Sequence, residues 1–201
     1  KMFFPAGFYY KTFMWPPSFW YKIYEPFIRM AAGFGEASIK HDKERYEHKY
    51  EYCDLLITGS GPSGLASAYS AAKNGARVIL AEDKPRFGGS LLTSDVNIGN
   101  QTGVEWAEKI IAELKTMPNV TVKNRSQVFG YYDHNMLVMS ERISDHLPKT
   151  QKYLPKQRLW YIRANEVLIS SGSIERPLVF GNNDTPGVML SSAAKEYMKV
   201  Y

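Results

Sequence analysis

The glycine-rich segment from Gly59 to Gly64 has the residue types and the spacing to bind a phosphate group. Its sequence Gly-Ser-Gly-Pro-Ser-Gly fits the pattern GxGxxG, directly after an apolar run typical of a strand and at the start of a helical stretch. In that context Gly59 permits a tight turn, Gly61 lets the backbone approach a pyrophosphate, and Gly64 lets the helix lie near the strand. Free N–H groups and the helix dipole also attract phosphate. We therefore expect a dinucleotide pyrophosphate at this turn, with Pro62 and Ser63 beside it.

Glu82 lies 18 residues after Gly64, the last of these glycines, at the end of the next predicted strand. A carboxylate at that position can accept hydrogen bonds from both hydroxyls of an adenosine ribose. Its negative charge would repel a 2′-phosphate, which favours NAD or FAD over NADP. We expect Glu82, with Asp83 beside it, to hold the ribose.

Two later segments could approach the same nucleotide. Gly88 and Gly89 lack a Cβ atom, as a second close approach of backbone to a dinucleotide requires, and Ser171-Gly172 follows a predicted strand. Each segment could also be an ordinary loop. We include Gly88, Gly89, Ser90, Ser171 and Gly172 among the predicted nucleotide contacts.

The elements that must position these residues begin with a βαβ unit. We predict a strand over 53–58, a helix over 62–74 capped by Gly75 in the left-handed conformation, and a strand over 78–81. Short apolar strands in this order indicate a parallel sheet covered on both faces. A helix over 103–115 and strands over 120–122, 128–132, 136–139, 157–162 and 166–170 follow.

The predicted fold class is therefore α/β, a flavin-type Rossmann dinucleotide-binding domain whose parallel sheet carries an inserted β-meander. The first residues lack the pattern of a natural start, and a helix from Ser191 is cut short near Tyr201. We expect the domain to be incomplete, because the last strands of a doubly wound sheet would lie beyond Tyr201.

An extended arm rich in aromatic residues precedes this domain. Prolines at positions 5, 16, 17 and 26 forbid one continuous helix, although a short helix over 24–33 fits, and the charged segment 41–50 indicates an exposed linker or helix. Large rings need burial, so we expect the arm to pack against its own domain or a neighbouring chain. The arm contains Phe3, Phe4, Phe8, Tyr9, Tyr10, Phe13, Trp15, Phe19, Trp20, Tyr21, Tyr24 and Phe27. The predicted division is an arm and linker over 1–50 and a partial Rossmann domain over 51–201.

The composition is that of a folded globular protein. Of its 201 residues 44% are hydrophobic and 22% charged, and the formal net charge is +5. No apolar stretch reaches the ~18 residues of a membrane-spanning helix, and the sequence starts without a signal-peptide pattern, so we expect a cytoplasmic protein with no membrane association. A local basic excess favours a solvated face or a docking surface for an acidic partner over nucleic-acid binding. This excess consists of Lys149, Lys152, Lys156, Arg158 and Arg163.

Other side chains offer little chemistry. Cys53 is the only cysteine, which excludes an intrachain disulfide and a CxxC redox pair, and its apolar surroundings predict a buried thiol. His41, Glu44 and His48 would share one face of a helix, but the dense mixed charge favours a solvated face, so no metal site is predicted. There is no GxSxG motif, and no catalytic acid or base is predicted.

Longer segments resemble the alpha subunits of heterotetrameric sarcosine oxidases. The resemblance lies in MFFPAGFYYKTFMWP and FWYKIYEPFIRMAAGFG near the start, the glycine unit with EDKPRFGGSLL, and ERPLVFGNNDTPGVML near the end. These blocks cover nearly the whole chain. The first and last blocks are more diagnostic than the glycine motif.

The resemblance implies a role within a larger complex. In that family the alpha subunit is much longer, and it assembles with beta, gamma and delta subunits. The complex oxidatively demethylates sarcosine to glycine, using FAD, FMN, oxygen and tetrahydrofolate, and its alpha Rossmann site holds NAD with no known part in turnover. The cofactor implied for this chain is therefore NAD, with FAD as the alternative.

Residue by residue, the resemblance places Gly59, Gly61 and Gly64 on the pyrophosphate and Glu82 on the ribose. It places Gly88 and Gly89 on the adenosine side and Ser171-Gly172 near the dinucleotide. Many relatives have Ala-Thr-Gly where this chain has Ser170-Ser171-Gly172, so Ser171 keeps a hydroxyl at the middle position. Two other functions stay open, a subunit of a related proline, hydroxyproline or opine dehydrogenase, and a structural module without nucleotide.

Overall fold

The computed structural model describes residues 16–35, 38–148 and 153–201 and divides the chain into two compact units, residues 1–43 and 44–201. In the first unit a 3-10 turn (Pro17–Phe19) and a π-helical turn (Trp20–Tyr24) lead into α2 (Glu25–Ala31), close to the expected helix. Phe19, Tyr21 and Phe27 are exposed within this chain. Aromatic residues 3–15 of the arm lie outside the described residues, so burial of the arm against neighbouring protein stays a prediction.

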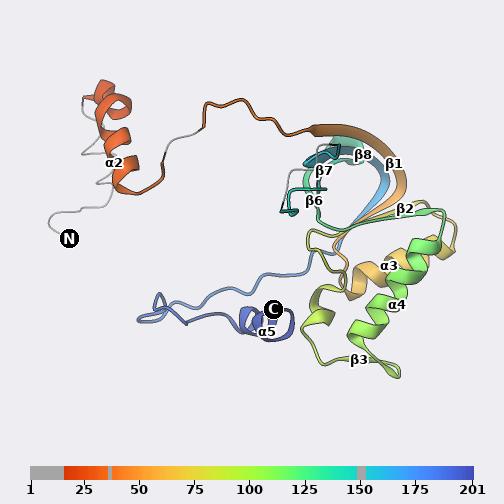
Figure 1. Ribbon diagram of the computed structural model, residues 1–201. Helices are drawn as coiled ribbons and strands as arrows, with labels where there is room; N and C mark the ends of the chain where they lie inside the picture. The colour runs from red at the N-terminus through yellow and green to blue at the C-terminus, as the bar shows by residue number, and fades with distance from the viewer. Residues whose placement is uncertain (1–15, 36–37, 149–152) are drawn as a thin grey trace. The chain divides into compact units, whose positions relative to one another are not determined.

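The second unit is built on one six-stranded sheet with the order β5-β2-β1-β8-β7-β6 (Figure 1). The first four strands in this order are parallel, whereas β7 pairs antiparallel with β8, and β6 pairs antiparallel with β7. The predicted parallel sheet with an inserted meander is thus confirmed. The bounds are β1 (Tyr46–Thr58), β2 (Val78–Ala81), β5 (Val120–Lys123), β6 (Ser126–Tyr132), β7 (Met136–Arg142) and β8 (Gln157–Ile169).

Two of these strands differ from the prediction. The charged segment expected to be a linker or helix contributes the first half of β1, because residues from Tyr46 onward pair in parallel with β8. The two strands expected over 157–162 and 166–170 are one continuous strand, since Arg163 and Ala164 keep the pairing with β1. As a result β1 and β8 run through both the parallel part of the sheet and the meander. The division into two units also falls a few residues before the expected boundary at Glu51.

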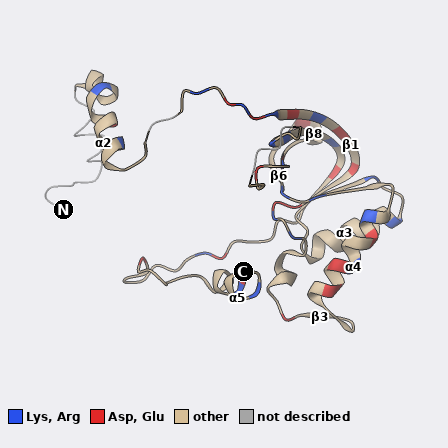
Figure 2. Ribbon diagram, viewed as in Figure 1, with Lys and Arg blue, Asp and Glu red and all other residues tan. Residues whose placement is uncertain are grey.

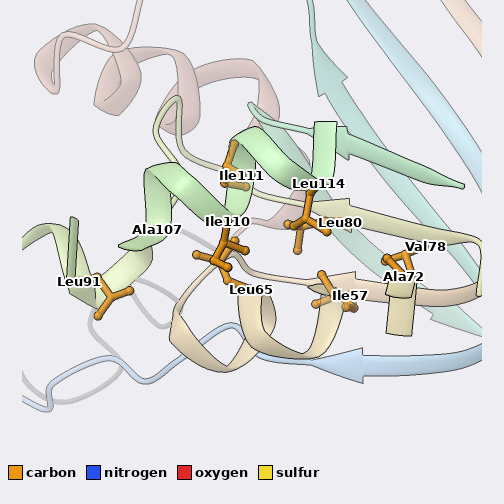
Figure 3. Packing of buried hydrophobic residues seen from close by; sticks show 11 residues of the cluster. Ile57, Leu65, Ala72, Val78, Leu80, Leu91, Ala107, Ile110, Ile111 and Leu114 are labelled. Carbon is orange, nitrogen blue, oxygen red and sulfur yellow. The ribbon is translucent and has the colours of Figure 1, made fainter. Parts of the chain in front are cut away.

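Helices α3 (Pro62–Lys73) and α4 (Gly103–Thr116) cover one face of the parallel strands (Figure 1). Leu65 of α3 and Ile110 of α4 pack with Ile57 and Leu80 of the sheet in one buried cluster, whose side chains Figure 3 shows between helices and strands. Both helices lie close to their predicted bounds, and Gly75 has the expected positive φ of 87°. Burial of this cluster fixes the start of α3 against the ends of the strands.

The other face of the sheet packs on itself. A second buried cluster consists of residues from strands that curve in Figure 1, among them Leu56, Met139, Trp160 and Ile162. Cys53 belongs to this cluster, as predicted, and burial raises the pKa of its thiol to about 12. The expectation of a sheet covered on both faces therefore holds in the described residues, since helices cover one face and the second cluster buries the other.

The remaining elements of this unit are short. They are η3 (Gly89–Leu92), the β3 (Asn97–Ile98) and β4 (Gln101–Thr102) hairpin, η4 (Asp133–Asn135) and the last helix α5 (Ser191–Lys199). Figure 2 shows acidic and basic residues interspersed along β1. In the part of the chain that the structure describes, no helix has the length and apolarity to cross a membrane.

Candidate dinucleotide-binding site

A cavity of about 950 Å³ lies where the parallel strands β1, β2 and β8 end. Ligands of doubly wound sheets bind at this edge, and the volume is within the range of nucleotide-sized pockets. The lining includes most of the residues predicted from sequence: Gly59, Gly61, Pro62, Ser63, Glu82, Asp83, Gly89, Ser90, Ser171 and Gly172. Gly64 and Gly88 do not line the cavity, and both are buried behind it.

The turn between β1 and α3 is held by close backbone packing. Gly59 has φ of 98°, and its N–H donates to the Ala81 carbonyl at 2.8 Å. A Cβ atom on Gly64 would lie 2.0 Å from the Gly59 carbonyl oxygen. The fold itself therefore requires both glycines. Gly59 is needed for its left-handed conformation, and Gly64 for the close approach of helix to strand.

Gly61 is different, because neither its conformation nor its protein neighbours require glycine. Its φ is −67°, and a Cβ atom there would meet no described atom within 4 Å. It immediately precedes α3, whose first turn has no side-chain cap and begins with Pro62. The N–H groups of that turn are thus left to a ligand, and the space beside Gly61 allows a phosphate to approach them.

Glu82 lies at the end of β2 and is only 6% exposed. Its Oε2 accepts from the Ser60 N–H at 2.9 Å and the Ser60 hydroxyl at 2.5 Å, and its Oε1 accepts from the Lys84 N–H at 3.0 Å. Burial raises the pKa of the Glu82 carboxyl above its usual range, a hydrogen bond with Asp83 adds to the rise, and the Ser60 and Lys84 donors oppose it.

The segment after β8 closes the glycine turn. The Ser170 hydroxyl lies 3.0 Å from the Thr58 carbonyl and 2.9 Å from the Gly59 carbonyl, while Ser171 and Gly172 line the cavity. The Ser170 hydroxyl therefore bonds to the turn, and Ser170 and Ser171 both line the cavity. On the other side Gly89 packs against Gly61, where an added Cβ atom would lie 2.8 Å from the Gly61 Cα atom.

Several lining residues were not predicted from sequence. Ser60 occupies a variable position of the glycine pattern and carries no signal of its own, although it is fully buried against Glu82. Lys84 and Arg86 follow Glu82, and β6 contributes Gln127 to Tyr131. The last helix contributes Ser192, Glu196, Val200 and Tyr201, with the last two just beyond its end. We call Gly59–Gly64 with Glu82 the turn wall, and these four residues the helix wall.

The helix wall is attached by exposed polar contacts. Glu175 accepts from the Ser192 N–H at 2.9 Å at the start of α5, and Lys84 forms an ion pair with Glu196. Lys199 pairs with Asp95. No residue of α5 is buried.

The other sequence hypotheses concern sites away from the cavity. His48 lies in β1, so the helical face proposed for His41, Glu44 and His48 does not form, and the described residues contain no cluster of three or more metal-binding side chains. Arg158 of the basic segment pairs with Glu47 and Glu141. Lys149 and Lys152 lie outside the described residues.

Comparisons with known proteins agree with the fold. Residues 54–145 match the family of FAD dependent oxidoreductases. The sarcosine oxidase alpha subunit of Rhizobium meliloti (strain 1021) is 47% identical over 98% of this chain, which spans 20% of that protein. An opine oxidase subunit of Agrobacterium tumefaciens (strain Ach5) is 26% identical over 74% of this chain and 29% of that protein.

Among solved structures, L-proline dehydrogenase from P. horikoshii has a similar fold. The TM-score is 0.60 at 22% identity, over 83% of this chain and 31% of that chain. The chain therefore spans about a fifth to a third of the proteins it resembles.

Proposed function

The chain is homologous to the alpha subunits of sarcosine oxidase, and from this premise we propose that its cavity binds NAD. Gly61 and the first turn of α3 would hold the pyrophosphate, Glu82 the adenosine ribose, and Gly89, Ser90 and Ser171 the remaining surface. The observation that carries the proposal is the open space at Gly61, a glycine that the fold does not need, directly before an uncapped helix start. Bound NAD would supply a nicotinamide able to accept hydride.

FAD is the alternative occupant, because the matching family is described as FAD dependent. Both dinucleotides share the adenosine diphosphate half that the turn wall fits. Nucleotide released by denaturing the purified full-length complex would distinguish them, since the two differ in mass and only FAD gives flavin fluorescence. Because the proposed complex carries flavin elsewhere, the Gly61→Val variant is the matched control. The occupant of this cavity is the nucleotide lost in that variant.

At the level of the complex, we propose that this chain belongs to the alpha subunit of a cytoplasmic assembly with beta, gamma and delta subunits. That assembly would oxidise sarcosine to glycine with oxygen and tetrahydrofolate, using FAD and FMN. The support is the 47% identity to a sarcosine oxidase alpha subunit, of which this chain spans 20%. No catalytic acid or base is assigned to the described residues, so this chain would bind and position a nucleotide.

Assays of the complex and of this chain alone test that division of labour. The full complex should produce peroxide with sarcosine, whereas residues 1–201 without the other subunits should produce none. Peroxide production by this chain, free of beta subunit, would contradict the proposal. Activity of the complex on opines or proline in place of sarcosine would favour the other candidate function, a subunit of an opine or proline dehydrogenase. The support for that function is the similarity to an opine oxidase subunit, at only 26% identity.

A further inference from the structure

Ser60, the residue between the first two glycines of the turn, is fully buried beside Glu82. Its N–H and its hydroxyl both donate to Glu82 Oε2, at 2.9 and 2.5 Å. The Gly88 N–H donates to the Ser60 carbonyl at 3.1 Å and also to the Ser60 hydroxyl oxygen at 3.2 Å. The hydroxyl therefore accepts from Gly88 and has its own proton directed at the carboxylate.

These contacts determine which oxygen of Glu82 can still accept a hydrogen bond. A carboxylate offers about four acceptor positions, two on each oxygen. Two donors from Ser60 occupy Oε2, and the Lys84 N–H occupies one position on Oε1. One position on Oε1 remains, because Asp83, the other side chain in hydrogen-bond contact with Glu82, can occupy it only when one of the two carboxyls is protonated.

We propose that Ser60 is a positioning residue for Glu82, holding Oε2 so that Oε1 is presented to a ribose hydroxyl of the bound dinucleotide. This inference rests on the proposed function, since it assumes that a dinucleotide occupies the cavity. Ser60 itself would touch Glu82 and Gly88, and it would act on the ligand through the carboxylate.

The Ser60 hydroxyl should also affect the pKa of the Glu82 carboxyl, which lies among several charged groups. Asp83 and Lys84 lie on the same loop as Glu82, and Arg142 of β7 donates to the Asp83 carbonyl at 2.6 Å. Lys123 of β5 has its ammonium 4.1 Å from the centre of the Trp160 ring and pairs with Glu141. A donor to a carboxylate favours its charged form, so removal of the Ser60 hydroxyl raises the pKa of Glu82 further. Glu82 then becomes protonated at a higher pH than in the natural protein.

The test is calorimetric titration of the full-length complex, freed of bound nucleotide, with NAD across a pH series. Ser60→Ala should weaken binding about tenfold near neutral pH, as expected for loss of a hydrogen bond to a charged group. It should also move the acidic limb of the binding profile to higher pH. In a Glu82→Ala background the same change should have almost no further effect, because Ser60 acts through Glu82.

Ser144→Ala is the matched control, because it removes another buried serine hydroxyl, one that donates to the Pro155 carbonyl at 2.9 Å, away from the cavity. It should leave both the affinity and the pH profile unchanged. If Ser60→Ala does not fold, Ser60→Cys can be used in its place, because a thiol is only a weak hydrogen-bond donor. The acidic limb of the NAD-binding profile should then move to higher pH in the same way.

The outcomes separate the two proposals. Suppose that Ser60→Ala keeps the NAD affinity and the pH profile of the natural protein while Glu82→Ala weakens binding. That result would overturn the positioning role of Ser60 but leave the proposed nucleotide site intact. An equal loss with and without Glu82 would also overturn that role, because Ser60 would then act by another route. If the natural complex binds neither NAD nor FAD in this cavity, both proposals fall.

Discussion

The two walls of the cavity are held in different ways. The turn wall is built from buried backbone contacts, such as the close approach of Gly64 to Gly59, and from the buried Ser60–Glu82 hydrogen bonds. The helix wall has no buried residue and depends on exposed contacts such as the Lys84–Glu196 ion pair. Buried hydrogen bonds to a charged group contribute more than exposed ion pairs, which solvent screens. The turn wall should therefore determine affinity, while the helix wall adjusts it.

The largest expected effect is on folding, at Gly64. Replacing Gly64 by Ala puts a Cβ atom 2.0 Å from the Gly59 carbonyl oxygen, so strand and helix must separate. We expect a loss of more than about 4 kcal/mol of folding free energy or a failure to fold. Denaturant unfolding of the full-length protein measures it, and stability equal to that of the natural protein would show that the turn wall is less rigid than described.

A large effect on binding alone is expected at Gly61. Gly61→Val should leave the free energy of unfolding nearly unchanged, because nothing lies within 4 Å of the added Cβ atom, but it should weaken NAD binding by roughly a hundredfold or more. Calorimetric titration and denaturant unfolding of the same sample measure both quantities. Gly181→Val is the control, since Gly181 also has open space and lies outside the cavity lining. Undiminished NAD binding in Gly61→Val would remove the main support for the nucleotide site.

At Glu82 the expected effect is intermediate. Glu82→Ala should weaken NAD binding roughly ten- to hundredfold, because hydrogen bonds to its carboxylate are lost while the pyrophosphate contacts remain. The preference for NAD over NADP should also fall, because the negative charge facing a 2′-phosphate is gone. Competition titrations with NAD and NADP test this, with the exposed Glu108 changed to Ala as control. Tighter binding of NADP than NAD by the natural protein would refute this role.

The smallest effect is expected on the helix wall. Glu196→Gln removes the ion pair with Lys84, in which the two side chains are 33% and 51% exposed, so NAD affinity should change by less than about fivefold. Raising the salt concentration should reduce even this difference. A tenfold or larger loss of NAD affinity in the same titration would mean that the helix wall and the turn wall contribute equally to binding.

The parts of the fold that follow from local pattern were predicted closely. The βαβ unit has apolar strands, glycines at fixed positions and a helix that ends at Gly75 within a short stretch of chain, so the end of β1 and the bounds of α3 and β2 agree with the structure. The first half of β1 was missed because Glu47, Lys49 and Glu51 alternate with exposed aromatic residues and give no apolar face. Pairing with β8, more than 100 residues away, makes that segment a strand, and no local signal reports it.

The site was predictable to a similar extent. The GxGxxG pattern and Glu82 identify the turn wall, because their roles depend on short spacings along the chain. Ser60 was missed because its partner Glu82 is known only once β1 and β2 lie side by side. The helix wall was missed because a charge on α5 and a charge after β2 meet only in the folded chain.

The parallel pairing of β1 with β8 also sets the order in which the chain can fold during its synthesis. Tyr46 pairs opposite Gln157, so β1 must wait for about 110 residues to be added, roughly 5–20 s at ordinary rates of translation. During that interval β1 can pair with β2, but its first half has no neighbour. Until β8 is synthesised, the first half of β1 is therefore an exposed strand edge of the nascent chain, which favours association with other chains.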